Sequence, residues 1–94
     1  MNTVPDQLDG ATVLATAPAT DDQVGIDYTD GTSIKIAYFA VAQYPNNGQR
    51  AYLFGVSTDH QVVSDFLYDS VEQAQSEAVR NGWVQPSTWR SQAR

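Results

Sequence analysis

Cysteine is absent from this chain of 94 residues. Disulfides, thiolate metal sites and cysteine nucleophiles are therefore excluded. Positive charge is also scarce, because Lys35 is the only lysine and the chain has five basic residues in all. Proteins that bind a nucleic-acid backbone rely on lysine and arginine, so nucleic acid is a poor candidate partner.

A long apolar segment is missing as well. The longest apolar run, Ile36 to Ala42, is far shorter than the roughly 20 residues that a membrane-spanning helix needs. The first ten residues are polar and have neither the basic start nor the apolar core of a signal peptide. We therefore expect a cytoplasmic protein that does not bind membranes.

Negative charge is abundant, and it is concentrated in the first thirty residues. The formal net charge is −6, and acids balance bases from Gly31 onward. The six acids of the first third are Asp6, Asp9, Asp21, Asp22, Asp27 and Asp30. Such a surface repels phosphate and either attracts a basic protein partner or only keeps the chain soluble.

Alternating apolar residues predict a sheet of four to five antiparallel strands. The segments are 11–17, 24–28, 33–44, 50–58 and 61–68. Asp30-Gly31 lies between two of them and is a strong hairpin signal. The segment 33–44 is apolar on both faces around Val41, which is typical of a central strand. We expect small residues such as Ala40 and Ala42 to let a helix approach it closely.

One C-terminal helix follows the strands. Ser70 and Gln73 form a capping box, and Asn81-Gly82 is typical of a helix end. The residues expected to face the sheet are Val71, Ala74 and Ala78, and those expected to face water are Glu72, Gln75 and Glu77. The sequence thus predicts an α+β fold, a hairpin meander with one helix packed on one face, in a single domain over 1–94. Residues 1–10 are expected to be a flexible leader and 84–94 a C-terminal tail in which Trp89 docks on the body.

No residue pattern indicates catalysis or a bound metal. His60 is the only histidine, and it lies beside Asp59 in an expected tight turn. A catalytic triad needs a sheltered nucleophile and an oxyanion hole, which such a turn does not provide. The aspartates do not match the spacing of a calcium loop. We expect neither an enzyme nor a cofactor.

The five tyrosines all fall in expected strands. Strands favour tyrosine for packing reasons alone, but an exposed tyrosine also supplies contact area at a protein interface. Candidate contact residues are therefore Tyr28 and Tyr52, together with four acids, Asp21, Asp22, Asp27 and Asp30.

Residues 40–83 resemble a group of small uncharacterised bacterial proteins. The resemblance rests on Ala42-Gln43-Tyr44-Pro45, on Tyr52-Leu53-Phe54, and on Asp65 followed by Tyr68-Asp69-Ser70-Val71-Glu72 and Ala74. It implies a Tyr-Leu-Phe strand that returns through a turn into a second strand and a capped helix, and it implies a bacterial origin. It carries no activity and no functional residue.

Three functions remain open. The first is a non-enzymatic protein-binding module, such as an inhibitor or immunity-type protein, that is a monomer or homodimer and meets a basic partner. The second is a small-molecule binder or minor enzyme with a site between sheet and helix or at a dimer interface. The third is a structural subunit that pairs through a sheet edge.

Overall fold

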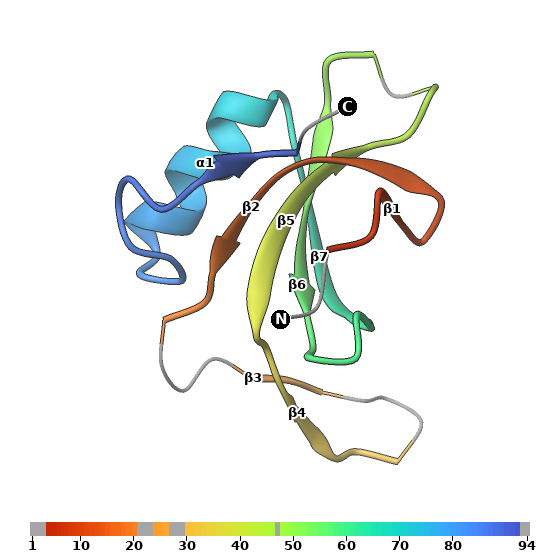
Figure 1. The fold of residues 1–94 in the computed structure, drawn as a ribbon, viewed down its shortest axis with the longest axis vertical. Coiled ribbons are helices and arrows are strands. Elements are labelled where there is room, and N and C mark those ends of the chain that lie inside the picture. The colour runs from red at the N-terminus through yellow and green to blue at the C-terminus, as the bar shows by residue number, and fades with distance from the viewer. Residues whose placement is uncertain (1–3, 21–23, 27–29, 47, 93–94) are drawn as a thin grey trace.

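A computed structural model describes residues 4–20, 24–26, 30–46 and 48–92. The strands are β1 (Gln7–Leu8), β2 (Ala11–Pro18), β3 (Val24–Ile26), β4 (Ser33–Lys35), β5 (Tyr38–Gln43), β6 (Ala51–Val56), β7 (Val62–Tyr68) and β8 (Arg90–Ser91), and the helix is α1 (Val71–Arg80). The main sheet has the order β1-β2-β5-β6-β7, with β8 beside β2, and every pair is antiparallel. The sheet is curled and α1 covers one of its faces (Figure 1). The expected α+β class is confirmed.

Strand β5 lies in the middle of the sheet and is buried on both faces, as its sequence predicts. Phe39 and Val41 belong to the cluster that α1 covers with Ala74. Ala40 and Ala42 belong to a second cluster on the opposite face, with residues of β1, β2 and β6. Contrary to our expectation, these two alanines do not face the helix. They pack on the opposite side of the sheet, against the N-terminal hairpin.

Segment 1–10 differs from the expected flexible leader over its described residues. Asp9 and Gly10 both have positive φ, 52° and 82°, which is the backbone of a type I′ hairpin turn. The turn returns β1 onto β2 and buries Leu8 in the second cluster. This strand could not be predicted from the sequence, because its two residues are too few to show an alternating pattern.

The strand expected over 33–44 is divided. β4 ends at Lys35, β5 begins at Tyr38, and Ile36 between them is buried. The break lets β3 and β4 form a separate two-stranded sheet that extends from one end of the molecule (Figure 1). The expected pairing across Asp30-Gly31 is confirmed, because β3 and β4 are antiparallel neighbours.

Strand β7 contains an irregularity that changes which face its first residues occupy. Gly55 pairs with Ser64 and Val56 pairs with Val62, so Val63 is an extra residue. Beyond it, the side chains alternate in the expected way. Before it, Val62 joins the second cluster and Val63 the helix-side cluster, which is the reverse of the expectation from simple alternation.

The helix begins and ends as predicted. The Ser70 hydroxyl accepts a hydrogen bond from the Gln73 amide at 3.0 Å, and the Gln73 side chain accepts one from the Asp69 amide at 2.7 Å. At the other end the amides of Gly82 and Trp83 bond to the carbonyls of Val79 and Ala78, the Schellman arrangement. Val71, Ala74 and Ala78 lie in the helix-side cluster, while Gln75 and Glu77 are half-buried rather than exposed.

Residues 84–92 form part of the body instead of an open tail. Val84 is buried and bridges to Ala19. β8 then pairs with Ala15 and Thr16 of β2, and Trp89 packs on the helix-side cluster, as expected. An edge of β2 is therefore covered by both ends of the chain.

Candidate protein-binding surface

Two of the six candidate contact residues, Asp30 and Tyr52, lie in the part of the chain that the structure describes. The other four, Asp21, Asp22, Asp27 and Tyr28, lie outside the described residues. Asp30 is located in the turn between β3 and β4, and Tyr52 is the second residue of β6.

Asp30 belongs to the separate β3–β4 hairpin, whereas Tyr52 belongs to the main sheet. β4 leads toward Tyr38, which pairs with Val56 at the end of β6. Tyr52 precedes Val56 by four residues, or about 13 Å at about 3.3 Å per residue. The β3–β4 hairpin extends away from that end (Figure 1). The structure therefore does not bring these two residues into one site.

Asp30 has a local structural role. Its carboxylate accepts hydrogen bonds from the Thr32 amide at 3.0 Å and from the Thr32 hydroxyl at 2.7 Å. These two hydrogen bonds lower the pKa of Asp30 below its ordinary value. The carboxylate thus closes the turn while its charge stays exposed.

Tyr52 is part of an aromatic row on the face of the sheet opposite α1. Its ring lies 5.4 Å from that of Tyr44 and 5.7 Å from that of Phe54. The Tyr44 hydroxyl donates to the carbonyl of Asp9 at 2.9 Å. Burial raises the pKa of Tyr44, and the charges of Asp9 and Asp65 raise it further. Tyr44 and Tyr52 are half-buried, while Phe54 is buried in the core.

The most exposed apolar surface of the sheet lies on β7, the last strand of the order. We term the outer side of β7 from Ser64 to Tyr68 the β7 edge surface. Phe66 is 44% exposed and Leu67 is 42% exposed. Among the described residues, Val24 of β3, at 58%, is the one other large apolar residue that is exposed.

Phe66 and Leu67 continue two apolar surfaces out to the edge. On the helix side Phe66 stacks on Trp83 at 5.2 Å, and Trp83 stacks on Phe39 at 5.6 Å. On the opposite face Leu67 is the register partner of Tyr52. The two exposed side chains are thus held by aromatic neighbours and not by contact with each other.

Sequence reasoning named neither Phe66 nor Leu67. It predicts a strand over 61–68 but no order for the strands, so it could not place this strand at the edge. A signal was available in the composition of β7, because two consecutive large apolar residues follow Ser64-Asp65. A strand with one polar face cannot bury both members of such a pair.

His60, in the turn between β6 and β7, contacts Tyr38. Its Nδ1 is 2.8 Å from the Tyr38 hydroxyl, and its φ is 65°. The Ser57 hydroxyl accepts hydrogen bonds from the amides of Asp59 and Gln61. The histidine ring and the serine hydroxyl are therefore each engaged with partners other than one another.

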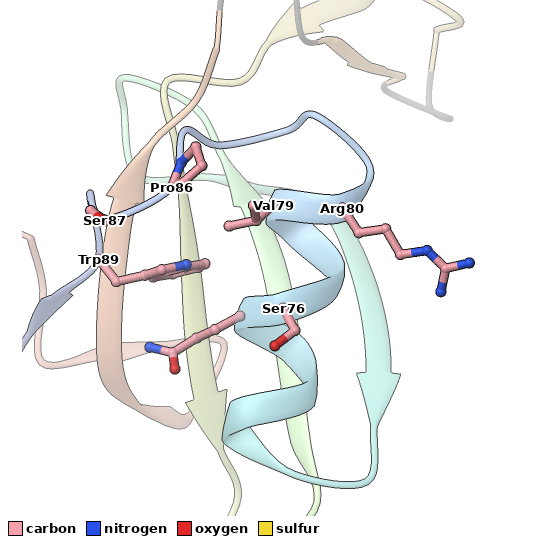
Figure 2. A pocket seen from close by; sticks show the side chains of 7 residues that line it. Ser76, Val79, Arg80, Pro86, Ser87 and Trp89 are labelled. Carbon is pink, nitrogen blue, oxygen red and sulfur yellow. The ribbon is translucent and has the colours of Figure 1, made fainter.

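Two shallow clefts lie away from β7. The first, of about 380 Å³, separates α1 from the C-terminal segment and is lined by Val79, Pro86 and Trp89 among others (Figure 2). The Trp89 indole extends toward the helix, and its Nε1 is buried with no hydrogen-bond partner among the described residues. The second cleft, of about 400 Å³, lies between Ser70 at the start of α1 and Gln49 of the β5–β6 loop.

The described residues contain no group of three or more side chains of histidine, cysteine, aspartate or glutamate that is suited to hold a metal ion. In the same residues, no helix has the length and apolar character needed to cross a membrane. Comparison of the chain with protein-family models, with curated proteins and with solved structures gives no match.

Proposed function

We propose that this chain is a small, acidic, non-enzymatic protein-binding module that meets its partner through the β7 edge surface. The observation that carries the proposal is the pair of exposed neighbours Phe66 and Leu67. Exposed large apolar side chains at an open strand edge are candidates for contact with another chain. Each of the two is supported from behind by an aromatic ring.

The charge around β7 favours a basic partner. Asp65 is the only charged residue of β7, and Asp69 follows its end. Both are exposed. Burial, and to a smaller extent the charge of Glu77, raises the pKa of Tyr68. Glu77 is itself paired with Arg80 at 3.3 Å, so Asp65 and Asp69 supply the negative charge of this surface. Complementary charge speeds association and excludes acidic competitors.

The acids of the first third of the chain belong to the same proposal. Asp30 keeps an exposed charge at the end of the molecule, and the net charge of the chain is −6. Such a field acts over about 10 Å at 0.1 M salt and steers a basic partner without touching it. Their role in the proposal is therefore to attract the partner, while β7 supplies the contact.

A non-enzymatic role is supported by how the reactive side chains are engaged. The His60 ring is bonded to Tyr38, and the Ser57 hydroxyl holds the turn. These arrangements favour binding over chemistry as the task of the chain.

The test is capture of a partner from the native host by wild type and by two variants, Phe66→Lys and Leu67→Lys. We expect each variant to lose the partner, because lysine places a like charge where an apolar contact is needed. Val24→Lys is the matched control, since Val24 is the other exposed large apolar side chain and lies on β3. Equal retention by all three variants, with unchanged circular dichroism, would contradict the proposal.

A further inference from the structure

Phe66 and Leu67 are consecutive in a strand, so their side chains lie on opposite faces of the sheet. Phe66 contacts Trp83 on the helix side, and Leu67 lies beside Tyr52 on the other side. A flat partner surface laid on either face would cover one of them and leave the other in water. A strand added along the edge covers both, because its own side chains alternate between the same two faces.

In the described residues, part of the β7 edge has no strand beside it. β7 is the end of the strand order; besides β6, it is contacted by α1 and also by β3. The contact with β3 includes Val63, where the Gly25 backbone lies so close that a Cβ would be 3.0 Å from the Val63 carbonyl oxygen. The stretch from Ser64 to Tyr68 has no strand neighbour on its outer side among the described residues. Five residues span about 17 Å at about 3.4 Å per residue, a common strand length.

We propose that the partner contributes an extended, basic segment that pairs with β7 as an additional strand. The inference rests on the proposed function and specifies how the partner binds. Main-chain hydrogen bonds to an open edge supply affinity, and side chains at alternate positions supply specificity. The segment needs apolar residues opposite Phe66 and Leu67. It needs a basic residue opposite Asp65, the exposed carboxylate of β7.

A second copy of this chain fits the edge less well. If two β7 strands paired antiparallel about Phe66, Asp65 of each would lie opposite Leu67 of the other, so a carboxylate would face an apolar side chain. Two molecules of net charge −6 also repel each other. The edge is thus suited to a segment of opposite charge and not to its own copy.

The probe is a capped hexapeptide of sequence Thr-Lys-Val-Val-Lys-Thr, which offers its charges in either strand direction. Its matched control is Thr-Glu-Val-Val-Glu-Thr. We expect the lysine peptide to bind wild type and the glutamate peptide to bind at least tenfold more weakly. Amide exchange measured by NMR is expected to slow at every second residue of 64–68, because alternate residues of an edge strand point their N–H groups outward.

Two N-methylated forms of the lysine peptide complete the test. Methyl groups on one set of alternate amides block the N–H groups that face β7, and methyl groups on the other set do not. We expect one form to lose at least tenfold in affinity while the other keeps it. Equal affinity of the two forms, protection that is not alternate, or no binding of the unmethylated peptide would overturn the proposal.

Failure here is distinguishable from failure of the proposed function. If Phe66→Lys loses the native partner but the amides of 64–68 show no alternate protection, a protein is bound by one face and strand addition is wrong. If sedimentation shows a dimer that Phe66→Lys dissociates, the edge takes a second copy and the basic partner is wrong. Val24→Lys is expected to bind the peptide as wild type does.

Discussion

The two long edges of the main sheet differ in how the chain covers them. The outer edge of β2 is paired twice, by β1 at Ala11 and Thr12 and by β8 at Ala15 and Thr16. The outer edge of β7 is paired by no strand in the described residues. Both ends of the chain therefore cover one edge, and the other is left open.

Hydrogen bonds join the N-terminal and C-terminal segments to β2 and to each other. The Val13 amide donates to the carbonyl of Asp6, and the Gln92 amide donates to the carbonyl of Leu14, each at 2.9 Å. The Gln92 side chain also donates to the carbonyl of Val4 at 3.2 Å. Backbone groups that would otherwise template another strand are thus satisfied within the molecule.

The open edge of β7 has a different protection. Asp65, with Asp69 beyond the strand end, gives it negative charge, and charged residues on an edge discourage pairing with like chains. The same charge does not discourage a basic segment. This difference between the edges is the basis of our proposal that β7 takes a basic segment and not a second copy of the chain.

The largest difference between the edges is expected in stability. Leu8 of β1 is 4% exposed, so Leu8→Ala should cost about 2–4 kcal/mol of unfolding free energy through lost burial and a cavity. Leu67→Ala on β7 removes the same atoms from a side chain that is 42% exposed and should cost about 1 kcal/mol or less. Urea titrations of the two variants compare the edges directly. Equal costs would mean that β1 does not cover β2 in solution.

The turn that folds β1 onto β2 gives the next effect. Gly10 has φ of 82°, so Gly10→Ala should cost about 1–2 kcal/mol of unfolding free energy, because a Cβ is strained in that region. Asp9→Asn is the control, since Asn tolerates the left-handed backbone that Asp9 adopts. Thermal unfolding of both variants measures the difference. An alanine variant as stable as wild type would argue against the type I′ turn.

Much of this fold could be predicted from the sequence, because its signals are local. The antiparallel strands β5, β6 and β7 and the capped helix each show their own alternation or cap. The edge assignments could not be predicted in this way. β1 and β8 are two residues each, and pairing between residues as distant as Ala15 and Ser91 leaves no periodic trace.

The candidate site illustrates the same limit. Tyr52 was named for its residue type, and the structure places it beside Leu67. Phe66 and Leu67 were passed over because exposure depends on strand order, which alternation does not encode. Likewise, Val63 lies against Gly25 and Ile36 lies against Gly55, contacts that no local pattern reveals.

The charges at the two edges are expected to have a smaller, salt-dependent effect on the affinity for the lysine hexapeptide. Replacing both Asp65 and Asp69 by Asn should raise the Kd of the lysine hexapeptide several-fold at low salt, because attraction between opposite charges is lost. Replacing Asp6 and Asp9, which lie at the covered edge, removes the same total charge and should change the Kd less. Fluorescence titration at two salt concentrations gives both values. A Kd that does not respond to salt in wild type would refute the electrostatic part of the comparison.

The smallest expected effect is at Trp89, in the segment that leads into β8. Its indole Nε1 is buried with no partner among the described residues, and a buried unpaired donor costs about 1–3 kcal/mol. Trp89→Phe removes that donor but also some apolar contact with the helix-side cluster, so the two changes should nearly cancel, within about 1 kcal/mol of unfolding free energy. Trp89→Ala is the control, because it removes the whole ring and should destabilise by about 3 kcal/mol. A phenylalanine variant as unstable as the alanine variant in urea titration would mean that Nε1 donates a hydrogen bond in solution. Trp89 would then anchor the segment leading into β8 by more than apolar contact.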